Sequence, residues 1–362
     1  MTTTSSFTAC THRIRAFIER GGGGDTAFAT LVRELFALQF AHVAPYRRLC
    51  EARGVSPESL GDWRQIPAVP AAAFKEFELT SLAPSECVAV FHSSGTTEHR
   101  PSRYFHSADS LAVYEAALRP WFARHVLPTA WSAFRPAMVC LAPPPQLAPH
   151  SSLVHMFACV SATFGGSGSR FLATVGADKA WQLDSAAALD ALREAESAGQ
   201  SVVLLGTAFM FVHMLDELAR RSLCFTLPPG SRLMETGGYK GRSRELPKAE
   251  LHALLTDRLG VPPESIVCEY GMSELSSQAY SLVANHSVFH FPPWCRALVV
   301  SPETGREVPD GETGLLRIFD LANVGSVLAL QTEDLAVRRG DGFELLGRAA
   351  PAEARGCSLL AA

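Results

Sequence analysis

The stretch that decides the fold is Val88-Ala89-Val90-Phe91, followed after His92 by Ser93-Ser94-Gly95-Thr96-Thr97-Glu98-His99-Arg100-Pro101. The apolar run predicts a strand. The small and hydroxylated residues after it predict a loop that offers backbone N–H groups and hydroxyls to an anion. Gly95 would let the backbone approach such an anion closely. An ordinary Ser/Thr turn between two strands has the same composition, so this loop alone leaves both interpretations open.

Further strands and helices alternate downstream of this loop. Apolar runs predict strands over 137–142, 201–206, 231–235 and 265–268, and helical spacing predicts helices over 108–122, 185–197, 209–218 and 246–259. Residues 11–52 also show helical spacing, and residues 53–87 are punctuated by proline. This alternation predicts an α/β fold with a mostly parallel sheet flanked by helices.

The character of the chain changes near residue 296. Short β-like runs follow at 297–301, 314–319, 327–331, 335–338 and 343–346, separated by glycine turns. They predict a small antiparallel β unit. The expected organisation is an α/β core over 1–295, a small antiparallel β subdomain over 296–350, and a C-terminal tail over 351–362 that carries Cys357.

Composition narrows the class of protein. The 362 residues carry a net charge of −4, with 47% apolar and 19% charged residues, so there is material for a large core and no basis for nucleic-acid binding. No apolar run reaches the length of a membrane span, and the polar N-terminus does not resemble a secretory signal. The nine cysteines are scattered without a Cys-x-x-Cys pair, which favours a reducing, cytoplasmic setting over a disulfide framework or a zinc site.

A second polar motif, Glu269-Tyr270-Gly271-Met272-Ser273-Glu274, directly follows the strand expected over 265–268. Tyr270 could stack on a flat base, Ser273 could donate to a phosphate, and Glu274 offers the oxygen ligands that Mg²⁺ prefers. A strand–turn–helix corner with a buried tyrosine explains the motif equally well when it is taken alone.

Three weaker signals complete the set. Asp334, in Gln331-Thr332-Glu333-Asp334, has a carboxylate that could accept from both hydroxyls of a ribose, although acidic turns are common. Arg348, after Gly347, could reach phosphate or ribose oxygens. Gly237-Gly238-Tyr239 follows a strand, where a glycine pair would let adenine lie against the backbone, and His92 beside the first loop suits an acyl carboxylate or a core histidine.

Four of these motifs, taken in order, resemble the signature set of the adenylate-forming enzymes. The phosphate loop departs from the family pattern, because Glu98 stands where a glycine is usual and the usual lysine is absent. The resemblance implies the N-terminal domain of that fold, with ATP and Mg²⁺ as cofactors and Glu274 as the metal ligand. The implied nucleotide-binding residues are Ser93, Ser94, Gly95, Thr96, Thr97, Gly237, Gly238, Tyr239, Tyr270, Gly271, Met272, Ser273, Asp334 and Arg348.

A closer resemblance is to the acyl-protein synthetases, the fatty acid–protein ligases of bacterial bioluminescence. It rests on the compact length, Pro293-Trp294 and the ending Arg355-Gly356-Cys357-Ser358-Leu359. It implies that the mobile C-terminal subdomain of the larger enzymes is absent. It also implies that a carboxylic, most typically fatty, acid is activated as acyl-AMP and transferred to Cys357 and then to a protein partner. The implied catalytic residues are Cys357, His92 and Arg348.

Two other functions stay open on the sequence. One is an acyltransferase on the same fold that moves an acyl group from a CoA thioester to an acyl carrier protein without ATP, which the departure at Glu98 and the lost lysine make realistic. The other is a non-catalytic scaffold for an acyl-reductase subunit. Release of pyrophosphate separates the first from a ligase, and nucleotide binding without turnover would indicate the second.

Overall fold

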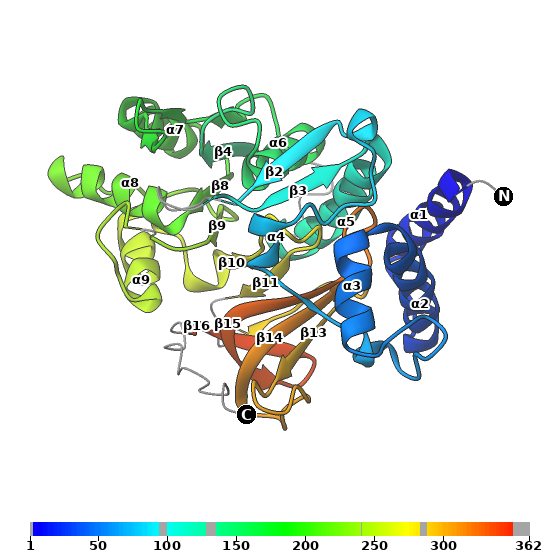
Figure 1. Ribbon diagram of the computed structural model, residues 1–362. Helices are drawn as coiled ribbons and strands as arrows, with labels where there is room; N and C mark the ends of the chain where they lie inside the picture. Colours follow the sequence, from blue (N-terminus) through cyan, green and yellow to red (C-terminus); the bar gives the residue numbers. More distant parts are fainter. Residues whose placement is uncertain (1–2, 94–99, 128–134, 240, 283–287, 350–362) are drawn as a thin grey trace.

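The computed structural model describes residues 3–93, 100–127, 135–239, 241–282 and 288–349, and two sheets organise them (Figure 1). The first sheet has six strands in the order β11-β10-β9-β8-β4-β5, in which β11 alone pairs antiparallel. Its strands are β4 (Ala137–Leu141), β5 (Arg170–Phe171), β8 (Val202–Thr207), β9 (Arg232–Thr236), β10 (Ile266–Tyr270) and β11 (Ala279–Leu282).

Helices cover both faces of this first sheet. Leu204, Leu233 and Ile266 belong to the core that contains α7, α8 and α9. Their neighbours Val203, Met234 and Val267 belong to the core that contains α5 and α6, as alternation along a strand requires. The helices are α5 (Ala108–Val126), α6 (Ser152–Phe164), α7 (Ser185–Ala198), α8 (Ala208–Arg220) and α9 (Lys248–Leu259).

The second sheet lies below the first in Figure 1 and is antiparallel in the order β12-β16-β15-β14-β13. Its strands are β12 (Val288–Phe289), β13 (Cys295–Val300), β14 (Thr313–Asp320), β15 (Ala329–Arg339) and β16 (Gly342–Arg348). A two-residue strand from far upstream, β1 (Val69–Pro70), pairs parallel with β15. The strands β1 and β12 show that residues before 296 also contribute to this sheet.

The N-terminal helices share a core with the second sheet. They are α1 (Thr3–Glu19), α2 (Asp25–His42) and α3 (Ala44–Ala52). Phe28, Leu35 and Phe36 of α2 are buried in the same cluster as Leu316 and Ile318 of β14. The buried Gln39 fixes the contact, because its amide donates to the Asn323 carbonyl at 2.8 Å and accepts from the Leu328 amide at 2.8 Å.

Short elements connect these layers. They are η1 (Trp63–Gln65), α4 (Ala73–Glu76), η2 (Pro84–Glu86), β2 (Ala89–His92), β3 (Arg103–His106), β6 (Ala173–Val175), β7 (Trp181–Leu183) and η4 (Pro263–Ser265). The pairs β2–β3 and β6–β7 are antiparallel and separate from the two sheets. The helix α4 lies against β1 and β3.

The predicted α/β class and the predicted strand of the first loop are confirmed, and one detail of the second sheet is corrected. We expected two strands over 327–331 and 335–338, but β15 runs unbroken from Ala329 to Arg339. Thr332, Glu333 and Asp334 look like a polar turn in the sequence. They remain within the strand because the register against β14 is irregular there, between Leu315 and Arg317.

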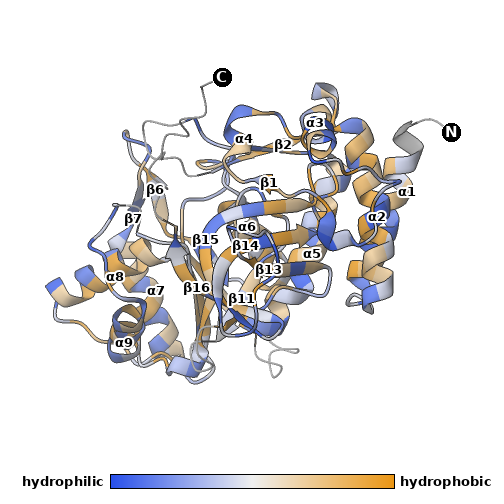
Figure 2. Ribbon diagram, turned by 60° about the horizontal axis from the view of Figure 1, so that its bottom comes forward, coloured by the Kyte–Doolittle hydropathy of each residue, from blue (hydrophilic) through white to orange (hydrophobic). Residues whose placement is uncertain are grey.

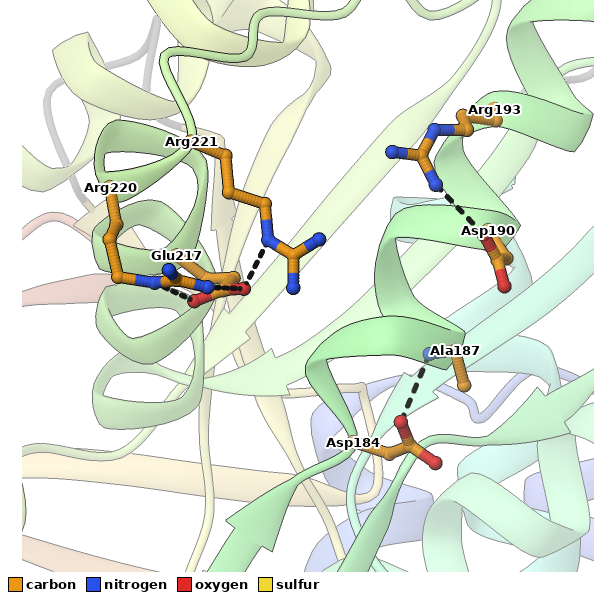
Figure 3. A network of polar contacts seen from close by, with 7 residues as sticks. All are labelled: Asp184, Ala187, Asp190, Arg193, Glu217, Arg220 and Arg221. Carbon is orange, nitrogen blue, oxygen red and sulfur yellow. Dashed lines mark hydrogen bonds and ion pairs between the residues drawn. The ribbon is translucent and has the colours of Figure 1, made fainter.

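Polar side chains stabilise the outer helices. Asp184 caps α7 by accepting from the Ala187 amide at 3.0 Å, and Glu217 of α8 pairs with Arg220 at 2.8 Å and Arg221 at 2.6 Å (Figure 3). Figure 2 shows α7 and α9 in alternating hydrophobic and hydrophilic colours, as expected for helices with one face on a core. Ion pairs at such exposed positions contribute little to stability, so burial of the apolar face holds these helices in place.

Among the described helices, no single one is long and apolar enough to span a bilayer; only the bent pair α2 and α3, at 107°, meets the length and composition test together.

Candidate functional site

Two hydrogen bonds donated by backbone amides close the base of the predicted phosphate loop. The Ser102 amide donates to Ser93 Oγ at 3.0 Å, and the Ser93 amide donates to the Ser102 carbonyl at 3.2 Å. The hairpin β2–β3 therefore delivers both ends of the loop to one place. Of the predicted loop residues, Ser94, Gly95, Thr96 and Thr97 lie outside the described residues, as does Cys357.

His92 lies at the end of β2, immediately before the loop. Its ring stacks on that of His150, with centroids 4.6 Å apart, and its amide donates to the His150 carbonyl at 2.8 Å. Burial, together with His150 and Arg103, lowers the pKa of His92. A neutral imidazole can donate one hydrogen bond to an acyl carboxylate, but it offers no charge to attract it.

Glu274, the predicted metal ligand, lies beside Ser102, the residue just before β3. It is buried, and Ser102 Oγ donates to its Oε1. Burial raises the pKa of Glu274, while the Ser102 hydrogen bond and the charges of Arg348 and Lys75 act against this rise. The phosphate loop and the Tyr270–Glu274 motif, which are far apart in the sequence, therefore meet at the pair Ser102–Glu274.

Tyr270 and Asp334 form the second contact between motifs. The Tyr270 hydroxyl donates to Asp334 Oδ2 at 2.7 Å, and Arg348 Nε lies 3.7 Å from Asp334 Oδ1. Burial raises the pKa of Asp334, and the Tyr270 hydrogen bond and the Arg348 charge oppose that rise. Pairing of β15 with β16 explains the contact, because Asp334 is directly opposite Arg348 in the register. The Arg348 side chain is 76% exposed and is free to turn toward a ligand.

The segment after Glu274 is held rigidly from the second sheet. The buried carboxylate of Asp320 accepts from the backbone amides of Ser276 at 3.0 Å and Ser277 at 2.8 Å, and from the Ser277 hydroxyl at 2.7 Å. Asn323 adds a bond from its amide to the Glu274 carbonyl at 3.0 Å. Both sheets therefore fix Glu274, whereas Met272 and Ser273 are half-buried just before it.

Glycines play two different roles around this motif. Gly237 has φ +67, in the left-handed region, and a β-carbon added at Gly237 or Gly238 would meet nothing within 4 Å. The backbone beside the end of β9 is therefore open, with Tyr239 half-buried next to it, and its contact with adenine stays a prediction. Gly271 is required for another reason, because a β-carbon there would collide with Glu269 Oε1.

Glu269 is a buried residue for which the sequence analysis predicts no role. Thr236 Oγ1 donates to its Oε2, and the two residues are opposite each other in the register of β9 and β10. Burial raises the pKa of Glu269 to about 7, although the Thr236 hydrogen bond acts against the rise. The only signal in the sequence for a buried carboxyl here is the apolar run Ile266-Val267-Cys268 directly before Glu269.

We predict that Glu269→Gln removes a pH-dependent cost of folding. Glu269 has its pKa raised from 4.5 to about 7 in the folded chain, so the unfolded chain ionises first as the pH rises. The free energy of unfolding of the wild type therefore falls by roughly 3 kcal/mol as the pH rises from 4.5 through about 7. Urea unfolding should show the variant gaining about that much relative to the wild type between about pH 4 and pH 8.5.

The exposed Glu303 on the turn after β13 is the matched control for this substitution. Glu303→Gln should run parallel to the wild type across the same pH range. A Glu269→Gln variant that also runs parallel would contradict the raised pKa of Glu269.

A second buried cluster lies on the other face of the same strands. Glu235 Oε2 is 3.4 Å from both Lys248 Nζ and His252 Nε2, and Cys268 Sγ is 3.9 Å from His252 Nε2. Burial opposes ionisation of Glu235, but His252 and Lys248 outweigh it and lower its pKa. The Glu235 carboxylate, the His252 imidazole and the Cys268 thiol lie close enough together to hold a metal ion. The Lys248 ammonium already supplies the positive charge there, so the cluster fastens α9 to β9 and β10.

The family comparison accounts for this convergence of motifs. The model of the acyl-protein synthetases (LuxE) matches residues 25–362. The chain belongs to this family. Similar proteins include the long-chain-fatty-acid–luciferin-component ligase of Vibrio harveyi, 22% identical over 338 residues that cover 91% of this chain and 85% of that protein. The protein of the same name from Aliivibrio fischeri is 22% identical and covers 85% of this chain and 78% of its own.

Solved structures place the family on the adenylate-forming fold. A 2-hydroxyisobutyryl-CoA ligase in its postadenylation state is similar with a TM-score of 0.65 at 16% identity, over 90% of this chain and 67% of that one. An open conformation of the same ligase gives 0.61 at 17% identity, over 90% and 69%. The predicted fold is therefore confirmed, and as a member of the acyl-protein synthetase family the chain is a ligase. The roles of individual residues stay predictions.

Proposed function

We propose that this acyl-protein synthetase uses ATP to convert a fatty acid to acyl-AMP at the site around Glu274, and then passes the acyl group to the thiol of Cys357. The observation that carries the proposal is the convergence of three distant motifs. Ser102 contacts Glu274, from which it is 172 positions away in the sequence. The Tyr270 hydroxyl donates to Asp334, from which it is 64 positions away. Each of these two contacts joins segments that are far apart in the sequence. Glu274 and Tyr270 belong to the same motif, so the two contacts lie in one site.

The first half-reaction follows from this donor set. A carboxylate oxygen of the acid attacks the α-phosphorus of ATP, the bond from that phosphorus to the bridging oxygen breaks, and pyrophosphate leaves with the electron pair. Asp334 would accept from the ribose hydroxyls, and Arg348, exposed beside it, would turn to the phosphate or ribose oxygens. Gly237 and Gly238 would leave the backbone bare for adenine.

Mg²⁺ fits the oxygen donors at Glu274. The carboxylate there has a serine hydroxyl as its neighbour, and both are the hard oxygen ligands that Mg²⁺ takes. Bound at Glu274 with the substrate phosphates, Mg²⁺ would neutralise part of their charge. The burial of Glu274 favours its protonated form in the free enzyme, so a bound cation would also draw the carboxyl into its ionised form.

The second half-reaction needs a thiolate. Attack of the Cys357 sulfur on the acyl carbon forms a thioester and releases AMP with the electron pair of the carbon–oxygen bond. Arg355, two residues away in the sequence, would favour the thiolate. The names of the relatives from Vibrio harveyi and Aliivibrio fischeri point to a long-chain fatty acid as substrate. A protein, such as an acyl-reductase subunit or an acyl carrier protein, would be the final acceptor.

The test is acid-dependent exchange of labelled pyrophosphate into ATP, scored over a panel of carboxylic acids of increasing chain length. We expect exchange that requires both Mg²⁺ and a fatty acid. Acyl transfer from an acyl-CoA with no exchange for any acid would instead support an ATP-independent acyltransferase. Nucleotide binding with no turnover of either donor would contradict both enzymatic functions.

We predict that Asp334→Ala chiefly raises the KM for ATP. The substitution removes the acceptor for the ribose hydroxyls and for the Tyr270 hydroxyl, so the KM should rise by about tenfold or more while kcat changes less. Initial rates at varied ATP measure this. The exposed neighbour Glu333 provides the control, because Glu333→Ala changes the same charge one residue away. An equal rise of KM in both variants would show that Asp334 has no specific contact with ATP.

A further inference from the structure

The short helix α4 carries Lys75 and packs on β3, the strand that follows Ser102. Phe74 of α4 is fully buried and stacks on Tyr104 of β3, with ring centroids 6.3 Å apart. Glu78, just after α4, pairs with Arg103 of β3 at 2.8 Å. Phe74 and Glu78, which flank Lys75, are thus fastened to the beginning of β3. Ser102, the residue just before β3, contacts Glu274. Lys75 itself is half-buried.

Two further contacts fix the ends of α4, one to β15 and one to the loop between β14 and β15. The Ala71 amide, just before α4, donates to the Gln331 carbonyl of β15 at 2.9 Å. The Ser81 amide, after α4, donates to the Gly325 carbonyl at 3.1 Å. The helix is therefore anchored to the β2–β3 hairpin on one side and to β15 and the loop before it on the other, which presets the position of the Lys75 backbone before any ligand binds.

The charge of Lys75 is not committed elsewhere in the described residues. Whereas Lys248 forms an ion pair with Glu235, the Lys75 ammonium forms none within the described part of the chain. The field of Lys75 does reach Glu274, together with that of Arg348. The stretch from Ser93 to Pro101, which has the phosphate-loop pattern, contains Arg100 but no lysine. A site for a triphosphate therefore has a lysine at hand that its own loop does not supply.

We propose that Lys75 is the lysine of the nucleotide site and that its ammonium contacts the phosphates of bound ATP. This inference rests on the proposed function. When the carboxylate attacks the α-phosphorus and the bond to the bridging oxygen breaks, negative charge accumulates on the departing pyrophosphate. Lys75 neutralises that charge from a preset position and takes no part in proton transfer, so the balance of the step is unchanged.

The test measures nucleotide affinity as well as turnover. Lys75→Met keeps the length of the side chain and removes its charge. Isothermal titration of the full chain with ATP should show affinity weakened about 10- to 150-fold in this variant. Titration with adenosine should be unchanged, because adenosine has no phosphate. Titration with AMP then separates contact with the α-phosphate, which weakens AMP equally, from contact with the outer phosphates, which does not.

Two control variants keep the result interpretable. Lys179→Met removes the same charge from the exposed turn between β6 and β7 and should bind ATP like the wild type. Lys75→Arg restores the charge and should recover much of the affinity. An unchanged melting temperature for Lys75→Met shows that the anchoring of α4 survives the substitution.

The outcomes distinguish this inference from the proposed function. Wild-type affinity for ATP in Lys75→Met would overturn the role of Lys75 and leave the ligase function standing. An equal loss for ATP and adenosine would also overturn it, because that pattern indicates a disturbed pocket. Absence of acid-dependent pyrophosphate exchange in the wild type would overturn the proposed function, whatever Lys75 contributes to ATP binding.

Discussion

Cys357→Ser should abolish hydroxylamine-labile labelling of the protein by radioactive fatty acid and ATP, while acid-dependent pyrophosphate exchange continues at the wild-type rate. The two half-reactions separate because the thiol takes no part in forming acyl-AMP. A serine hydroxyl is almost wholly protonated at neutral pH, whereas a thiol is partly thiolate and intrinsically more nucleophilic. Mass spectrometry of tryptic peptides from the labelled wild type should find the acyl group on the peptide that contains Cys357.

The other cysteines supply the controls for this prediction. Burial raises the pKa of Cys140 and Cys268 to about 12, which keeps both as thiols near neutral pH. Cys224 is the matched control because it is exposed and Arg258 Nη1 lies 3.3 Å from its sulfur. For Cys357, the arginine that is near in the sequence is Arg355. Cys224→Ser should leave labelling intact. Undiminished labelling in Cys357→Ser, or an acyl group on another cysteine, would show that Cys357 is not the acceptor.

The double variant Thr96→Ala, Thr97→Ala should lose acid-dependent pyrophosphate exchange by about 10²- to 10⁴-fold. Each hydroxyl is predicted to donate to an ATP phosphate, and loss of one hydrogen bond to a charged group costs about 1.5–3 kcal/mol. Stability should barely change, because the hydrogen bonds between Ser93 and Ser102 that close the loop involve neither threonine. Exchange rates and melting temperatures measure the two effects.

Thr313→Ala, at an exposed position at the start of β14, tests whether a threonine-to-alanine change by itself affects the assay. The two single variants should each retain an intermediate rate. Exchange at the wild-type rate in the double variant would remove the phosphate-binding role from this loop.

The sequence was most informative where a pattern is local. Short stretches of four to six residues predicted the strands β4, β8, β9 and β10 to within a residue or two of their ends. The two-residue strand β1 could not be predicted, because Val69 and Pro70 are extended only through their pairing with Leu330 and Gln331. The polar stretch in β15 had the same difficulty, since neighbouring strands rather than local propensity keep Thr332–Asp334 extended.

The candidate site divides in the same way. Tyr270, Glu274, Asp334 and Arg348 could be proposed from the sequence, because each belongs to a short local motif. Lys75 could not, since it belongs to no motif, and Ser102 ends the loop motif without any sign of its contact with Glu274. Ser102 reaches Glu274 across 172 positions of sequence, and Lys75 is brought there by the packing of Phe74 on Tyr104. Contacts of that kind depend on the tertiary fold, which a pattern of residue types in one sequence does not encode locally.

The bond between Gln39 and Asn323 has a consequence for how the chain is made. These residues are 284 positions apart, and the apolar face of α2 is covered by strands that follow residue 312. On the ribosome, α2 is therefore complete long before its packing partner is translated. Until then Phe28 can pack on Trp63 and Phe36 on Tyr46, but the part of their core that Leu316 and Ile318 supply is missing. Docking of β14 and β15 onto these helices should therefore be a late step of biosynthesis. Ribosome-bound chains halted ahead of β14 would expose this surface and be prone to aggregate.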